Sequence, residues 1–184
     1  MGKSKKEIKV VLEIPQGVNV ELVGPIVKVK GKSGEVAKKM SDPNITIRKE
    51  GTQFIIQALK KSKRQRKLVE TFSAHAKNMF KSAEEGSRCV LKICSGHFPM
   101  NVSIKGNEFT VKNFFGEKIP RAIKLKTGAK VTVEGDLITV ESPDKELSSQ
   151  VAADIEKLTK RTQYDLRIFQ DGIWIIEKDG KLLK

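Results

Sequence analysis

Hydrophobic and polar positions alternate along most of the chain. In two stretches apolar residues recur at helical spacing instead. In residues 1–82 the alternation predicts five strands, at 8–15, 18–23, 26–30, 45–49 and 54–59. Apolar residues then recur at helical spacing between Leu68 and Phe80. This spacing predicts a helix from about Ser62, its candidate N-cap, to about Glu85. The first half is therefore predicted to be an antiparallel sheet followed by one helix.

The same order of elements recurs in residues 83–184. Alternation predicts strands at 89–94, 102–104, 109–112, 122–126, 130–133 and 137–141. A helix is predicted from Ser142-Pro143-Asp144 to about Lys160, with an apolar stripe that includes Val151 and Ile155. The tail, about 161–184, has no counterpart in the first half. We expect it to hold two short strands about the turn pair Asp171-Gly172.

The two halves are also related residue by residue. Residues 18–35 and 100–117 align at an offset of 82 with 7 identities in 18 positions. We therefore predict an α+β fold: two tandem copies of a mostly antiparallel β-sheet covered on one face by a single α-helix, plus a C-terminal β extension. The predicted domains are 1–82 and 83–184, the second including the tail.

Charge is distributed unequally between the two copies. The chain has a net charge of +14, of which residues 1–82, with 19 Lys/Arg and 7 Asp/Glu, carry +12. The densest cluster, "KKSKRQRK" (60–67), lies at the predicted helix start, where cations oppose the helix dipole. A polyanionic partner is the simplest reason for it, and a solvated charged face is the alternative. Its candidate RNA-binding residues are Lys60, Lys61, Lys63, Arg64, Arg66 and Lys67.

The second copy has a different candidate surface. Phe114-Phe115 stands where the first copy has Lys32-Ser33. Two adjacent phenylalanines cannot both point into one sheet face, so we expect one ring to be exposed near Lys112, Lys118 and Arg121. An exposed ring among cations can stack on unpaired bases. The alternative is that both rings are buried between the two domains.

Motifs for other chemistries are missing from the sequence. The turn Gly31-Lys32-Ser33-Gly34 lacks the glycine that a phosphate-binding loop needs at position 26 and is flanked by predicted strands. Cys89 and Cys94 have no second pair with which to form a zinc site, so we expect reduced structural cysteines. No catalytic triad or carboxylate pair has a recognisable spacing. We expect no enzyme, metal or cofactor, and neither a membrane span nor a signal peptide, hence a cytoplasmic protein.

Three stretches resemble one protein family. "AHAKNMF" (74–80), "LKICSGHFPMNVSIKG" (91–106) and "RIFQDGIWIIEK" (167–178) are similar to the sixth protein of the large ribosomal subunit, in its archaeal and eukaryotic branch, and most similar to the archaeal proteins. The resemblance covers the whole chain, including the repeat. The chain departs from the family at Trp174, where a tyrosine is usual, and in the more polar stretch 81–87.

The resemblance implies a function without catalytic activity. Family members bind large-subunit ribosomal RNA chiefly through the second domain, near the stalk base and the sarcin–ricin loop, where translation factors dock and other ribosomal proteins are neighbours. Residues of the second domain and tail are then expected to bind RNA: His97, Lys112, Asn113, Phe114, Phe115, Gly116, Lys118, Arg121, Lys160, Arg161, Arg167, Gln170 and Gly172. The first domain's cluster is expected to bind more weakly.

Two other functions fit the same charge. A free-standing nucleic-acid binder, such as a chromatin protein, would bind any duplex equally. An adaptor would bind acidic proteins through the basic helix start and would have no affinity for RNA. A ribosomal protein would prefer its own large-subunit RNA.

Overall fold

The chain folds into two compact units, Met1–Gly86 and Ser87–Lys184. A computed structural model describes residues 8–96 and 98–183, and the statements below concern these residues. All strand pairs in both units are antiparallel, as the sequence predicts. Within the described ranges, neither helix is long and apolar enough to span a membrane. Each unit is treated separately below.

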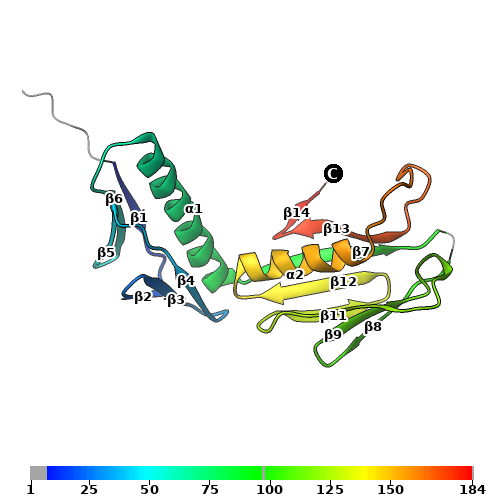
Figure 1. Cartoon of the computed structure of the whole chain (residues 1–184). Helices are drawn as coiled ribbons and strands as arrows, with labels where there is room; N and C mark the ends of the chain where they lie inside the picture. Colours follow the sequence, from blue (N-terminus) through cyan, green and yellow to red (C-terminus); the bar gives the residue numbers. More distant parts are fainter. Residues whose placement is uncertain (1–7, 97, 184) are drawn as a thin grey trace, which may run out of the picture. The chain divides into compact units, whose positions relative to one another are not determined.

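The first unit has two three-stranded sheets and one helix (Figure 1). One sheet has the order β1-β6-β5 and the other the order β2-β3-β4. The strands are β1 (Lys9–Glu13), β2 (Asn19–Val23), β3 (Ile26–Lys30), β4 (Glu35–Lys39), β5 (Ile45–Glu50) and β6 (Gln53–Ala58). The helix α1 (Lys63–Glu85) packs on both sheets, and its buried face includes Val69, Ala76 and Phe80.

Local sequence explains both ends of α1. Ser62 is the N-cap, as predicted, and its side chain accepts a hydrogen bond from the Gln65 backbone N–H at 3.2 Å. At the other end, Gly86 adopts a positive φ of 79° and its N–H donates to the Ser82 carbonyl. The helix therefore ends where glycine permits the left-handed backbone.

The Gly31–Gly34 turn has a structural role at this helix end. The Ser33 N–H donates to the Ala83 carbonyl at 3.0 Å, and the Ser33 hydroxyl donates to the Glu84 carbonyl at 3.1 Å. A Cβ on Gly31 would lie 2.3 Å from the Ala83 carbonyl oxygen. The turn thus satisfies carbonyls that the last helical turn leaves without partners, and only glycine permits the approach.

The second unit repeats this plan and extends it. Its first sheet has the order β10-β9-β8, and its second has the order β11-β12-β7-β13-β14. The strands are β7 (Ser87–Cys94), β8 (Asn101–Lys105), β9 (Glu108–Lys112), β10 (Arg121–Lys124), β11 (Lys130–Glu134), β12 (Leu137–Ser142), β13 (Gly172–Lys178) and β14 (Lys181–Leu182). Strands β7 to β12 correspond in order to β1 to β6, and β13 and β14 form the predicted C-terminal extension.

The helix α2 (Lys145–Leu158) packs against β7, β12 and β13 (Figure 1). It also covers the backbone at the outer edge of β13. The Ile173 N–H donates to Thr159 Oγ1 at 2.9 Å, and the Ile175 N–H donates to Glu156 Oε1 at 3.2 Å. Further along, β14 pairs with Glu177 and Lys178 of β13. The outer backbone groups of β13 are thus hydrogen-bonded by side chains along the first half of the strand and by β14 along the second half.

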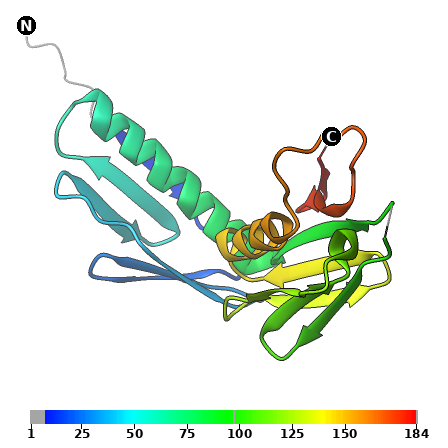
Figure 2. The same cartoon turned by 45° about the vertical axis from the view of Figure 1, so that its right-hand side comes forward.

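Several boundaries differ from the prediction. The units divide after Gly86, not after residue 82, because α1 continues to Glu85. Helix α2 begins at Lys145 with Asp144 as its N-cap, so Pro143 lies before the helix. The tail strands turn at Asp179-Gly180 rather than at Asp171-Gly172. Residues 161–171 form an irregular segment instead (Figure 2).

Asp179 connects this hairpin to the start of the second unit. Its carboxylate accepts hydrogen bonds from the Ser87 hydroxyl at 2.8 Å and the Arg88 N–H at 3.0 Å, and Lys145 Nζ lies 2.9 Å from it. Burial raises the pKa of Asp179, but the bonds from Lys145, Ser87 and Arg88 outweigh burial and hold the pKa below its ordinary value of 3.8. The charged form is therefore favoured in the folded state.

We expect Gly31→Ala to destabilise the first unit by about 1–3 kcal/mol, because its methyl group would overlap the Ala83 carbonyl. Urea unfolding of the variant measures the effect. Lys32→Ala, in the same turn but on an exposed side chain, is the control and should leave stability within about 0.5 kcal/mol. Equal stability of the two variants would contradict the close approach.

We expect Asp179→Asn to destabilise the second unit by about 1–3 kcal/mol at pH 7, because charged hydrogen bonds are lost. The folded-state pKa is depressed, so the contribution is present above the unfolded pKa and disappears as the pH falls through the folded pKa. The difference in stability should therefore begin to shrink below about pH 4 and should close only below the folded-state pKa, which is lower than 3.8. Asp165→Asn is the control, because Asp165 lies in an exposed segment; a gap that persists in acid would contradict the assignment.

Candidate RNA interface

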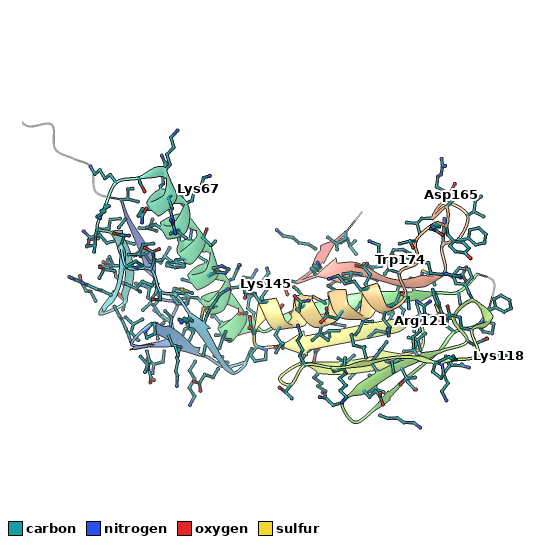
Figure 3. All side chains as sticks on the ribbon, viewed as in Figure 1. Lys67, Lys118, Arg121, Lys145, Asp165 and Trp174 are labelled. Carbon is teal, nitrogen blue, oxygen red and sulfur yellow. The ribbon has the colours of Figure 1, made fainter. Side chains whose placement is uncertain are left out.

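The predicted cation cluster of the first unit is exposed. Its members lie at and before the first turns of α1, and the structure leaves all six exposed: Lys60, Lys61, Lys63, Arg64, Arg66 and Lys67. Figure 3 shows Lys67 at this end of the helix. The first turn of α1 contains no acidic residue, and Arg66 pairs with Glu70 at 3.1 Å on the surface. The cluster thus adds positive charge at the positive end of the helix dipole, which folding alone does not favour.

Three segments meet at one end of the second unit, and we call this region the loop end. It comprises residues 95–96 and 98–100, called the 95–100 segment below, together with residues 113–120 and 160–171. Asn113 Nδ2 donates to the Pro99 carbonyl at 3.0 Å, and the Phe115 and Tyr164 ring centroids lie 6.1 Å apart. In Figure 3, Lys118 and Asp165 lie at this end, whereas Lys145 lies at the other end of the unit.

Arg121 braces the loop end from inside. Its Nε and Nη2 donate to the two Glu117 carboxylate oxygens at 2.8 and 2.6 Å, and its Nη1 donates to the Leu158 carbonyl at 2.8 Å. Its guanidinium lies 4.5 Å from the Phe114 ring centroid. The hydrogen bond and charge of Arg121 hold the pKa of Glu117 below its ordinary value, against the effect of burial.

The direction of Arg121 corrects the prediction that it faces RNA. On β10, Arg121 and Ile123 share a face, and they lie opposite Val111 and Phe109, which are both buried. The side chain therefore occupies an inward position and is 26% exposed. Its role in the structure is to join the 113–120 segment to the end of α2.

The two phenylalanines are divided between core and loop. Phe114 is fully buried in the second unit's own core, so it cannot stack on RNA, and it does not lie between the domains either. Phe115 is half-buried, edge-on to Phe114 with centroids 5.0 Å apart, and close to Tyr164 and Phe169. The prediction of one exposed ring at these two positions is therefore wrong, because Phe114 is buried and Phe115 is half-buried.

Arg161 is a second internal brace. Its guanidinium lies 4.7 Å from the Phe115 centroid and 4.2 Å from that of Tyr164, and its Nη2 donates to the Tyr164 hydroxyl at 3.0 Å. It thereby holds the 160–171 segment against the 113–120 segment. Like Arg121, it is predicted from sequence as an RNA contact but lies half-buried among aromatic rings.

The tail contributes one buried position. Gly172 is buried beneath the Trp174 indole, whose Nε1 donates to the Gln170 carbonyl at 3.0 Å. The Gly96 N–H donates to the Asp171 carboxylate and so fixes the 95–100 segment to the tail. Gly172 therefore lies beneath the surface of this end, and its predicted contact with RNA stays a prediction.

The remaining candidates lie at the surface. Those exposed at the loop end are Lys112, Gly116, Lys118, Lys160, Arg167 and Gln170, and Asn113 is half-buried. Arg167 pairs with Asp165 at 3.0 Å but stays 90% exposed. His97 lies outside the described residues. The structure thus brings most of the predicted positions of the second unit together at one end and divides them into surface cations and internal braces.

Four residues that build this end were not predicted from the sequence. Glu117 binds Arg121, Tyr164 and Phe169 pack on Phe115, and Phe98 lies over Gly116. One signal was available: Arg121 is in phase with Ile123 in an alternating strand, which indicates an inward side chain. The aromatic contacts join segments far apart in the chain and have no local signal.

Comparison with known proteins agrees with this organisation. The sequence model described as "Ribosomal protein L6" matches residues 14–86 and 98–172, one segment in each unit. Proteins named "Large ribosomal subunit protein uL6" are similar over almost the whole chain. The protein of Sulfurisphaera tokodaii is 43% identical over 169 residues, 91% of each chain, and that of Methanococcus vannielii is 41% identical over 172 residues, 94% of each chain.

A third relative, from Methanosarcina mazei, bears the same name and is 40% identical over 173 residues, which are 94% of this chain and 98% of the relative. The matches cover both units, so they support the predicted duplication as well as the predicted resemblance. Identity at this level across nearly the full length establishes the family. The chain belongs to the ribosomal protein L6 family, in its archaeal branch.

Proposed function

We propose that this protein is a structural constituent of the large ribosomal subunit and binds large-subunit ribosomal RNA chiefly through the loop end of the second unit. Family membership supports this assignment. The observation that carries the binding surface is that Lys112, Lys118 and Lys160 are exposed on or beside segments that two half-buried arginines hold in place. The protein would then act in the cytoplasm, as part of the ribosome, without a catalytic role.

The location within the subunit is part of the proposal. The site would lie near the base of the stalk and the sarcin–ricin loop, with ribosomal proteins of the stalk base as neighbours and translation factors docking nearby. The resemblance of the loop-end motifs supports it, because "LKICSGHFPMNVSIKG" and "RIFQDGIWIIEK" run through the 95–100 segment and the tail. There the protein would neutralise phosphate repulsion where RNA segments converge.

The mechanism of binding follows from the surface chemistry. Lysine and arginine side chains contact phosphates and supply affinity without reading sequence. The exposed cations lie on or beside the 113–120 and 160–171 segments. Because Arg121 and Arg161 fix both segments before RNA arrives, little conformational entropy needs to be lost on binding. Preorganisation therefore favours affinity as much as charge does.

The first unit would make a second, weaker contact. Six exposed cations at the start of α1 offer phosphate-binding groups but no aromatic or glycine-rich surface beside them. Such a cluster supplies electrostatic attraction that weakens with salt. It would strengthen binding to RNA already positioned by the second unit.

We expect Lys63→Gln, Arg64→Gln and Arg66→Gln together to weaken binding to large-subunit RNA and to reduce the slope of log Kd against log salt by roughly 2–3, about one per phosphate contact. Filter binding over a salt series measures both. Lys77→Gln, later on the same helix and exposed, is the control. An unchanged slope in the triple variant would remove the first unit from the interface. Equal affinity for any duplex would favour a chromatin-type protein, and no RNA affinity would favour an adaptor.

We expect Lys118→Gln to change the salt dependence of RNA binding and Arg121→Met to change the stability of the second unit. Lys118→Gln should reduce the salt slope by about one without changing stability, because Lys118 is an exposed cation. Arg121→Met should lower the stability of the second unit by about 1–3 kcal/mol and weaken RNA binding at an unchanged slope, because Glu117 and the Leu158 carbonyl lose their donor. A reduced slope for Arg121→Met would show that its guanidinium reaches a phosphate after all.

A further inference from the structure

Phe98 is a large aromatic side chain that the fold leaves exposed. It lies between β7 and β8 in the 95–100 segment, and 46% of its surface is accessible. The core of the second unit is filled by other rings, including the fully buried Phe109 and Phe114. Folding therefore does not require Phe98 to remain aromatic.

One face of the Phe98 ring rests on Gly116. A Cβ built on Gly116 would lie 3.7 Å from Cε1, 3.7 Å from Cζ and 3.8 Å from Cε2 of the ring. Nearly equal distances to three consecutive ring carbons place that point over the ring face, because a point beyond the ring edge would be clearly nearer to Cζ. The ring therefore turns one face toward Gly116, and 46% of the side chain remains accessible.

The turn beneath Phe98 is strained. Asn113 and Phe115 have positive φ angles of 59° and 50°, and Gly116 follows at 73°. Non-glycine residues seldom adopt this region, and such strain persists only where the surroundings enforce it. Burial of Phe114 and the bond from Asn113 to the Pro99 carbonyl enforce it here. One result of the strained backbone is a glycine held flat beneath an aromatic ring.

Two lysines lie close to Gly116 in the sequence. Lys118 is two residues from Gly116, and Lys112 ends β9 immediately before the turn; both are exposed. A supported ring with one free face and neighbouring phosphate-binding groups is the arrangement that proteins use to stack unpaired bases. We propose that Phe98 stacks on one unpaired nucleobase of the RNA; this inference rests on the proposed function and assigns a base contact within it.

Exposed aliphatic side chains nearby give an internal control. Ile119 is 80% exposed on the same segment as Gly116, and it has no π-face on which a base could stack. A protein partner covering this end would bury Ile119 as well as Phe98. RNA stacking would depend on Phe98 alone.

The test compares Phe98→Leu, Phe98→Trp and Ile119→Ser with the wild type in filter binding to large-subunit ribosomal RNA from the same source. Phe98→Leu should weaken binding about 5- to 150-fold, the range that base–aromatic stacking supports, at an unchanged salt slope. Phe98→Trp should bind within about threefold of the wild type, because indole also offers a π-face. Ile119→Ser should bind like the wild type, and thermal unfolding should be the same for all four proteins.

Chemical probing of the RNA supplies a second readout. One nucleotide should be protected by the wild type and Phe98→Trp, and should become reactive with Phe98→Leu. Wild-type affinity of Phe98→Leu, or equal losses in Phe98→Leu and Ile119→Ser, would overturn the stacking proposal while leaving RNA binding intact. Failure of the wild type to bind the RNA would overturn the proposed function itself.

Discussion

The bond between the Arg121 guanidinium and the Leu158 carbonyl is the contact on which the loop end depends. It joins the start of β10 to the last turn of α2, and the same guanidinium binds Glu117 and lies against Phe114. A charged side chain in an inward position is costly unless its donors find partners. Here the partners are a carboxylate, a helix-end carbonyl and an aromatic face, so the charge is retained where the neighbouring strand positions are apolar.

The first unit binds the end of its helix without a charged side chain. Val36 occupies the position on β4 that corresponds to Arg121, and it pairs with Val29 as Arg121 pairs with Val111. The carbonyls at the end of α1 are instead satisfied by Ser33, from the Gly31–Gly34 turn. In the first unit the turn after β3 therefore binds the end of α1, and in the second unit Arg121, the first residue of β10, binds the end of α2. The duplication conserved this contact between elements while the chemistry that makes it changed.

Features of the fold that depend on residues close together in the chain were predictable from the sequence. Ser62 was identified as a cap, and the alternation located most strands, because caps and pleats depend on residues close in the chain. Strand β4 was missed because "EVAKK" places one valine among polar residues. Phe114 and Arg121 were expected outside and lie inward, since their partners, Leu158 and the core, come from distant segments. For the same reason the Asp179 carboxylate, more than 90 residues beyond Ser87 and Arg88, had no sequence signal.

The outer edge of β13 has a consequence for the protein before it reaches its RNA. Exposed strand edges invite pairing with strands of other molecules, and basic proteins made in excess of their RNA are at risk of such aggregation. Thr159 and Glu156 already accept the bonds of the Ile173 and Ile175 amides, and β14 occupies the rest of that edge. A second copy therefore finds few amides on this edge with which to extend the sheet. The helix end that anchors the loop end thus also occupies backbone amides of β13 that a strand of another molecule could otherwise pair with.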